Sequence, residues 1–367
     1  MSQYRQIILH AGLSKTGTTS IQDNCEKYRA FLQERGIVYP QFRFDGEPFI
    51  THSIPLTVAI TGRPGKYGLM LRQRFRANVD DVMRSCREQM DDLLNTPRGD
   101  TLLLSTELID SFDDHDMVSL HAYLAPHTEH LRVLAYIRSP QSALESLLQE
   151  RIKMGGLPEA AALVGRTRHK VENLQRNFRA ALEVVNFHDG LRHTHGLVGS
   201  FFALLGLSSV DLTGLEFISR NERLSMEAFN LMWAINQRYP PRDQKIHQVP
   251  RQPRDLDLLG RLPGPAFHLS DFISSGLHQA CLDEAAWLES RLGFEFPLEP
   301  RRQHEPLWQD RTLAVLEQTL RALRSARIIQ FTADFLRGEA RQCKVARPAT
   351  AQQLERISRN LWSDYPF

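Results

Sequence analysis

A short apolar run that meets a turn of glycine, lysine and hydroxyl residues is the feature that most constrains this chain. The segment "QIILHAG", Gln6–Gly12, has the pattern of a buried strand, and "LSKTGTTS" follows it directly. Glycines at 12 and 17 allow backbone angles that are closed to other residues. The amides that begin a helix after such a turn lack partners and attract negative charge. The stretch therefore predicts a strand, an anion-binding turn and a helix.

This turn is not a Walker loop. A Walker loop has the pattern GxxxxGK[ST], with its lysine directly after the second glycine. Here the lysine precedes the second glycine by two positions. The remaining ingredients fit an anion cradle, because backbone amides, threonine hydroxyls and a lysine ammonium all favour negative charge. We expect the anion to be bound by Lys15, Thr16, Gly17, Thr18 and Thr19.

Strands and helices alternate along the first part of the chain. Apolar segments that predict strands lie at Tyr4–His10, Gly36–Pro40, Asp100–Leu108, Leu131–Arg138 and Val184–Phe187. The segments between them have helical patterns, among them Thr18–Glu34, Leu69–Leu94 and Gln141–Lys153. Such alternation predicts a parallel sheet covered by helices on both faces. The expected fold class is α/β, a three-layer α/β/α arrangement of the P-loop type.

Beyond about residue 216 the strand signal fades. Helical patterns cover Ser225–Gln237, Ser274–Leu292, Arg311–Leu336 and Ala351–Trp362. A Pro/Arg-rich stretch, Arg238–Leu256, has the composition of a long loop, which fits a linker, an insertion or a lid equally well. We therefore divide the chain into an α/β core, residues 1–215, and a largely helical extension, residues 216–367, packed on that core.

Composition excludes several classes of protein. The 367 residues are 42% hydrophobic and 24% charged, as in ordinary globular proteins. A net charge of +2 gives no sign of a nucleic-acid partner, and no apolar run approaches the roughly 20 residues that span a bilayer. Four scattered cysteines lack the spacing of zinc ligands or of a disulfide framework. We expect a cytoplasmic protein without a metal.

The segment "KTGTTS", Lys15–Ser20, resembles the 5′-phosphosulfate-binding loop of sulfotransferases that use 3′-phosphoadenosine-5′-phosphosulfate (PAPS). Those enzymes hold the 3′-phosphate with an arginine at the end of a later strand and a serine eight residues further on. The segment "YIRSPQSALES" supplies Arg138 and Ser146 at that spacing. Eight residues span a turn and about one and a half helical turns, so both side chains can converge on one phosphate.

The resemblance has recognisable anchors over residues 4–208, with two departures from the cytosolic enzymes of animals and plants. Ser20 stands where those enzymes carry a tryptophan that stacks on adenine, and their "RKG" motif is missing from the C-terminal half. The chain is therefore more similar to the bacterial or carbohydrate-modifying branch. The resemblance implies PAPS as donor, PAP as product and no required metal. The acceptor would be a hydroxyl of a glycan, a glycolipid or another small metabolite.

The resemblance places Lys15 at the oxygen that bridges phosphate and sulfate, and it leaves two candidates for the base. Glu107, in "LLLSTEL", occupies the position where cytosolic sulfotransferases carry a histidine, and other sulfotransferases use glutamate. A carboxylate within reach of the hydroxyl, with a pKa raised by partial burial, could accept the proton. His52, in "ITHSIP", is the second candidate.

Two other functions stay open. In a P-loop kinase or NTPase, "LLLSTE" would be a strand carrying a carboxylate linked to Mg²⁺, although the lysine position opposes this. A non-catalytic nucleotide-binding protein on a sulfotransferase fold is the other alternative. The leucines of Arg311–Leu336 fit either core packing or a contact in a homo-oligomer.

Overall fold

The computed structural model describes ten stretches of the chain, and its residues form two compact units. The stretches are 3–49, 51–64, 68–75, 77–107, 112–157, 163–218, 223–239, 253–269, 274–297 and 306–364. The first unit takes residues 1–143, 165–220 and 282–297, and the second takes 144–164, 221–281 and 298–367. Most of the expected long loop, residues 240–252, lies outside the described residues. The core boundary at residue 215 and the packing of the extension on the core stay predictions.

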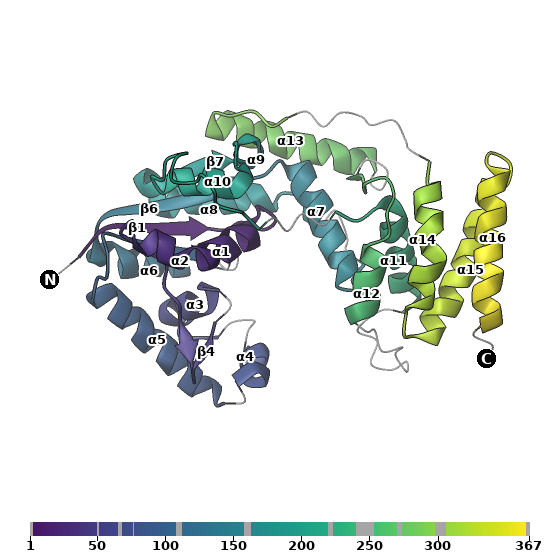
Figure 1. The fold of residues 1–367 in the computed structure, drawn as a ribbon. Coiled ribbons are helices and arrows are strands. Elements are labelled where there is room, and N and C mark those ends of the chain that lie inside the picture. The colour runs from purple at the N-terminus through teal and green to yellow at the C-terminus, as the bar shows by residue number, and fades with distance from the viewer. Residues whose placement is uncertain are drawn as a thin grey trace. The chain divides into compact units, whose positions relative to one another are not determined.

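The first unit is built on a five-stranded sheet in which every pairing is parallel (Figure 1). The order across the sheet is β2-β5-β1-β6-β7. The strands are β1 (Tyr4–Ala11), β2 (Ile37–Val38), β5 (Thr101–Thr106), β6 (Thr128–Ile137) and β7 (Leu182–Asn186). A separate antiparallel pair joins β3 (Arg43–Phe44) to β4 (Glu47–Pro48). The expected α/β class with a parallel central sheet is confirmed.

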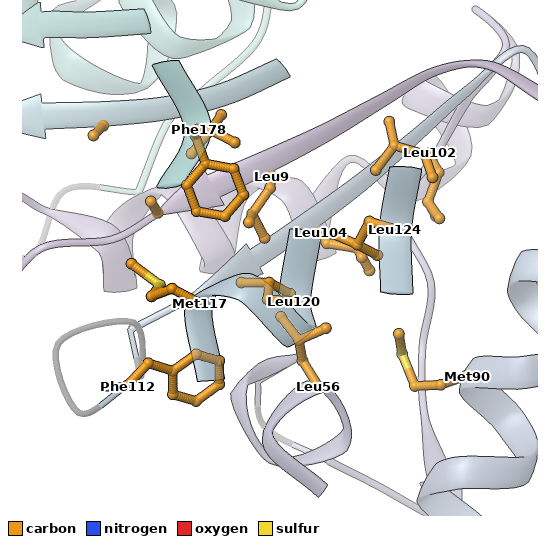
Figure 2. Packing of buried hydrophobic residues seen from close by; sticks show 14 of the residues in the cluster. Leu9, Leu56, Met90, Leu102, Leu104, Phe112, Met117, Leu120, Leu124 and Phe178 are labelled. Carbon is orange, nitrogen blue, oxygen red and sulfur yellow. The ribbon is translucent and has the colours of Figure 1, made fainter. Parts of the chain in front are cut away.

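Successive side chains of the central strand bury into different hydrophobic clusters. Ile7 and Leu9 pack in one cluster, part of which Figure 2 shows, and Ile8 packs in another. The first cluster draws on α3 (Ser53–Thr61), α5 (Val79–Asn95), α6 (Asp114–Leu124) and α8 (Arg166–Phe178). The second draws on α1 (Thr18–Lys27), α2 (Arg29–Gln33) and α10 (Gly196–Leu204). Because strand side chains alternate between faces, helices cover both faces of the sheet.

The helix expected over Leu69–Leu94 is wrong as a single element. The chain forms α4 (Gly68–Phe75) and then α5. Asn78 is the N-cap of α5: its backbone is extended and its side chain accepts a hydrogen bond from the amide of Asp80. An N-cap residue has a non-helical backbone, so Asn78 interrupts the helical pattern and a new helix begins after it. The helix expected over Thr18–Glu34 is likewise divided, into α1 and α2.

Several shorter elements complete the first unit, and two helices cross from one unit to the other. The 3₁₀ helix η3 (Ala125–His127) precedes β6, η5 (Arg179–Ala181) precedes β7, and α9 (Phe187–Arg192) follows β7. The crossing helices are α7 (Pro140–Lys153) and α13 (Ser275–Leu292). Helix α7 begins in the first unit and continues into the second, whereas α13 begins in the second and continues into the first.

The second unit is helical and has its own buried core, which contains Phe229, Leu316 and Ile329. Besides its parts of α7 and α13, it contains α11 (Met226–Arg238), α12 (Pro253–Gly260), α14 (Asp310–Arg321), α15 (Ala326–Cys343) and α16 (Pro348–Asp364). The single helix expected over Arg311–Leu336 is wrong, because Ser325 caps the start of α15 by accepting from the amide of Ile328. In the described parts of the chain, no helix has both the length and the apolar composition needed to cross a bilayer.

Candidate active site

Three of the predicted site segments follow strands that lie next to one another. The loop Gly12–Gly17 follows β1, Glu107 follows β5, and Arg138 follows β6. From β1 the chain first adds β2 and β5 on one side of this strand, and then adds β6 and β7 on its other side. The order therefore reverses at β1. Ligands of open α/β sheets bind at the carboxyl ends of strands at such a point.

The loop after β1 has a defined backbone. Lys15 and Gly17 adopt left-handed conformations, with φ of 68° and 77°. The Thr16 hydroxyl donates to the carbonyl of Leu13 at 2.7 Å, which closes the turn between them. A Cβ added to Gly12 would lie 2.4 Å from the Thr18 hydroxyl oxygen, so glycine lets the start of α1 approach the end of β1. A lysine in the left-handed region costs about 1–2 kcal/mol, and other contacts must offset that strain.

The start of α1 resembles another helix start in the same unit. Gly17, the N-cap of α1, offers no side chain to its first amides. Helix α8 also begins at a left-handed glycine, Gly165, with φ of 82°. There the Glu284 carboxylate accepts from the amides of Gly165 and Arg168 at 2.9 and 3.0 Å. A helix start of this kind therefore receives an anion from α13, and the corresponding amides of α1 suit an anionic ligand.

Arg138 connects the end of β6 to the loop after β1. Its Nη1 donates to the carbonyl of Lys15 at 2.9 Å, and its Nε donates to the Ser142 hydroxyl at 2.7 Å. The guanidinium also lies over the ring of Phe187, 5.0 Å from the ring centre. The sequence analysis did not predict Ser142 as a partner of Arg138, although Ser142 lies only four residues further along the chain. The predicted Ser146 lies one helical turn later, in the part of α7 that belongs to the second unit.

A second lysine contacts the loop. Lys170, on α8, donates from Nζ to the hydroxyl of Ser14 at 3.4 Å. The sequence shows a basic run here, "RTRHK", but a run of charges does not indicate which loop it contacts. The contact places a further ammonium beside the residue that precedes Lys15.

Glu107 lies beside the first turn of α1. Its carboxylate accepts from the Thr19 hydroxyl at 3.3 Å, and the residue is exposed, so the expectation that this carboxylate is partly buried is wrong. Its backbone amide donates to the hydroxyl of Ser53 at 3.0 Å, which ties the end of β5 to the start of α3. Two predicted residues are thus brought together, Thr19 in the first turn of α1 and Glu107 after β5.

His52 is buried, and both of its ring nitrogens are in hydrogen bonds. Nε2 donates to the carbonyl of Pro40 at 2.8 Å, and Nδ1 accepts from the amide of Ser105 at 3.2 Å. Burial lowers the pKa of His52 to about 4. The nitrogen that could accept a proton, Nδ1, therefore already accepts a hydrogen bond from a backbone amide. The imidazole connects β5 to the segment before α3.

Two further histidines, the buried His10 and the half-buried His188, border the strands and were not predicted. His10, on β1, makes a 2.8 Å hydrogen bond with the Ser105 hydroxyl, and burial lowers its pKa to about 3. His188 accepts from the amide of Ser139 at 3.3 Å, and burial followed by the charge of Arg138 lowers its pKa to about 4. Both rings are neutral near pH 7. Among the described residues, no group of three or more His, Cys, Asp or Glu side chains could hold a metal ion.

The fold and this loop define an α/β protein with a candidate anion site at the point where the strand order reverses. No family model matches the chain, and no curated protein sequence matches it. The solved structures that are similar include a sulfotransferase from Alicyclobacillus acidocaldarius and the sulfotransferase domain of the olefin synthase from Synechococcus PCC 7002.

The first of these structures is 16% identical, with a TM-score of 0.34 over 64% of this chain and 93% of its own. The second is 12% identical, with a TM-score of 0.35 over 81% of this chain and 98% of its own. Because both TM-scores are below 0.5, neither likeness carries weight for the function of this chain.

Proposed function

We propose that this chain is a sulfotransferase that moves a sulfuryl group from PAPS to a hydroxyl of a glycan, a glycolipid or another small metabolite. The observation that carries the proposal is the glycine-capped start of α1, with Lys15 in its loop, Arg138 on the Lys15 carbonyl and Lys170 on Ser14. Positive groups and the backbone amides of a helix start around one loop favour negative charge, so this loop suits an anionic ligand.

The donor would lie along this loop. The amides of Gly17, Thr18 and Thr19 would bind the 5′-phosphate, and Lys15 would neutralise the oxygen between phosphate and sulfur. Each charge-assisted hydrogen bond of this kind contributes on the order of 1.5–3 kcal/mol. Arg138 is assigned to the 3′-phosphate, and the role of Ser146 stays a prediction from its spacing in the sequence. A guanidinium carries five N–H donors, so Arg138 can serve both the loop and a phosphate.

Glu107 is the residue we assign as the base. The acceptor oxygen forms a bond to sulfur while the bond from sulfur to the phosphate oxygen breaks, and the electron pair of that bond leaves with PAP. The acceptor proton passes to the Glu107 carboxylate, whose hydrogen bond from Thr19 keeps it near the donor loop. We favour it over His52 because it is exposed, whereas both nitrogens of His52 are bonded within the protein.

A transfer assay tests this proposal. The full chain is incubated with sulfur-labelled PAPS and with extracted glycolipids, glycans and small alcohols. We expect label to appear in one acceptor class with wild type and to be lost with Lys15→Ala. PAP binding without transfer to any acceptor would favour a non-catalytic binding protein, and a preference for Mg-ATP would favour a kinase; either result contradicts the proposal.

A further inference from the structure

The turn that joins α15 to α16 carries positive charge without acidic neighbours in the sequence. Residues 340–354 include three basic side chains, Arg341, Lys344 and Arg347, and no Asp or Glu. The structure describes this whole segment, which belongs to the second unit. Arg347 donates from Nη2 to the thiol of Cys343 at 3.4 Å. Among the described residues, no carboxylate forms an ion pair with any of the three cations, so their charges are available to an external anion.

Helix stability explains only part of this charge. Arg341 and Lys344 stand at the end of α15, where the helix dipole favours cations. Arg347 directly precedes α16, which begins at Pro348, and the start of a helix disfavours a cation. The stability of the two helices therefore does not account for the third cation, which completes a positive turn.

An apolar side chain stands between the cations. Val345 is 96% exposed, more than any other large apolar side chain in the described part of the chain. Ala346, Pro348 and Ala349, which follow it, are exposed as well. Apolar surface in water is unfavourable, so this turn gains from a partner that removes Val345 from water.

The turn is held by a packed pair of helices. The Ser358 hydroxyl on α16 donates to the carbonyl of Ala333 on α15 at 2.7 Å. The amide of Arg347 donates to the carbonyl of Cys343 at 2.8 Å, which closes the turn. The turn lies at the end of the pair that is opposite to the C-terminus (Figure 1). The three cations and Val345 are therefore displayed together on one short, ordered turn.

We propose that this turn docks on the surface of an anionic lipid bilayer. Acidic head groups attract basic side chains, and each Lys or Arg near such a surface raises binding about fivefold. The boundary between head groups and acyl chains accepts an apolar side chain such as Val345. A bilayer offers both partners, whereas nucleic acids attract basic residues mainly through their phosphates. Docking is additional to the proposed sulfuryl transfer and does not depend on it.

Co-sedimentation of the full chain with lipid vesicles tests the docking. One set of vesicles contains equal amounts of phosphatidylcholine and phosphatidylglycerol, and the other contains phosphatidylcholine alone. We expect the anionic vesicles to bind at least about tenfold more tightly, and added salt to weaken this binding. Equal binding to both sets, or no binding to either, would overturn the proposal.

Substitutions in the turn locate the binding. A variant that combines Arg341→Gln, Lys344→Gln and Arg347→Gln should bind anionic vesicles about a hundredfold more weakly, because three charges are lost. Val345→Ser alone should weaken binding at least about threefold, since it removes apolar surface that the bilayer would cover. Circular dichroism checks that both variants are folded.

A second triple variant is the matched control for net charge. It combines Arg84→Gln, Arg98→Gln and Arg192→Gln, which remove three exposed charges from the first unit, each from a pair with an Asp. This control should lose less than about threefold in affinity, because these charges act on the bilayer only through their screened long-range field. A loss equal to that of the triple variant in the turn would overturn the proposal.

Two further measurements distinguish docking from other activities. A duplex DNA oligonucleotide that binds more tightly than anionic vesicles, with Val345→Ser as tight as wild type, would indicate a nucleic-acid surface and contradict the proposal. Lys15→Ala should bind vesicles like wild type even though it is expected to impair PAPS chemistry. Failure of sulfuryl transfer with intact vesicle binding would therefore contradict the proposed function alone.

Discussion

Arg138 donates a hydrogen bond from Nη1 to the main-chain carbonyl of Lys15 at 2.9 Å, which joins the residue after β6 to the loop after β1. Lys15 is left-handed, with φ of 68°, at a cost of about 1–2 kcal/mol. A hydrogen bond from a charged donor contributes about 1.5–3 kcal/mol, which is enough to offset that strain. The shape of the loop after β1 therefore depends on the arginine that follows the neighbouring strand β6.

Replacing this arginine should disturb the loop and weaken donor binding. We expect Arg138→Gln to lower PAP affinity at least about tenfold, because it removes the charged contacts to the Lys15 carbonyl and to Ser142. Arg138→Lys should not restore affinity, since a single ammonium lacks the planar fork that reaches both. Arg192→Gln, which alters an exposed pair with Asp189, is the control. Calorimetric titration measures the affinity for PAP, and an Arg138→Gln affinity equal to that of wild type would contradict the account.

Lys170 should contribute to donor binding through charge. We expect Lys170→Gln to weaken PAP binding and to make it less sensitive to salt, because one ammonium near the loop is lost. Arg176→Gln is the matched control: it removes the same charge from α8, but Arg176 pairs with Asp114. The assignment of Lys170 fails if the two variants show the same affinity and the same salt dependence.

The choice of base can be settled with two substitutions. Glu107→Gln should abolish sulfuryl transfer while leaving PAP affinity within a factor of about two, because the amide keeps the shape but accepts no proton. His52→Gln should lower the free energy of unfolding and leave transfer by the folded protein intact. Transfer rates from labelled PAPS, measured beside PAP titrations, distinguish the two. Normal transfer by Glu107→Gln with loss in His52→Gln would reverse the assignment.

Buried neutral histidines should make stability fall in mild acid. Burial lowers the pKa of His10 to about 3 and that of His52 to about 4, whereas an unfolded histidine titrates near 6.5. Below pH 6.5 the unfolded chain binds more protons, so this stability is complete above pH 6.5 and is lost as the pH falls towards the folded values. Each histidine contributes up to about 1.4 kcal/mol per pH unit in that window.

Urea unfolding between pH 7 and pH 5 measures this effect. The free energy of unfolding should fall with decreasing pH, and His52→Gln should show a shallower slope because one of the three histidines with a lowered pKa, His10, His52 and His188, is gone. An equal free energy of unfolding at pH 7 and pH 5 in wild type would show that these imidazoles are not held neutral.

The sheet and the turn between β1 and α1 could be predicted because their signals are local. An apolar run such as Gln6–Ala11 followed by two glycines leaves few alternatives to a strand and a tight turn. The breaks within helices were missed because Asn78 and Ser325 lie inside longer apolar patterns, and a cap is indistinguishable there from an exposed polar residue. Tertiary packing, rather than the spacing of apolar residues along the sequence, decides where such a segment is divided into two helices.

The site could be predicted only where spacing carries information. The positions of Lys15, Arg138 and Glu107 at strand ends follow from the alternation of strands and helices. The contact of Lys170 with Ser14 joins segments far apart in the chain, and no local pattern specifies it. The environment of His52 depends in the same way on β5, because the backbone amide of Ser105 in that strand donates a hydrogen bond to the ring.

The central claim is that the loop between β1 and α1 binds a phosphorylated adenosine without a metal. Calorimetric titration of PAP in the presence of EDTA, compared with Mg-ATP, tests it most directly. We predict that wild type binds PAP under these conditions, that Lys15→Ala weakens this binding at least about tenfold, and that Lys27→Ala, at the other end of α1, does not. Absence of PAP binding together with tight binding of Mg-ATP would contradict the account.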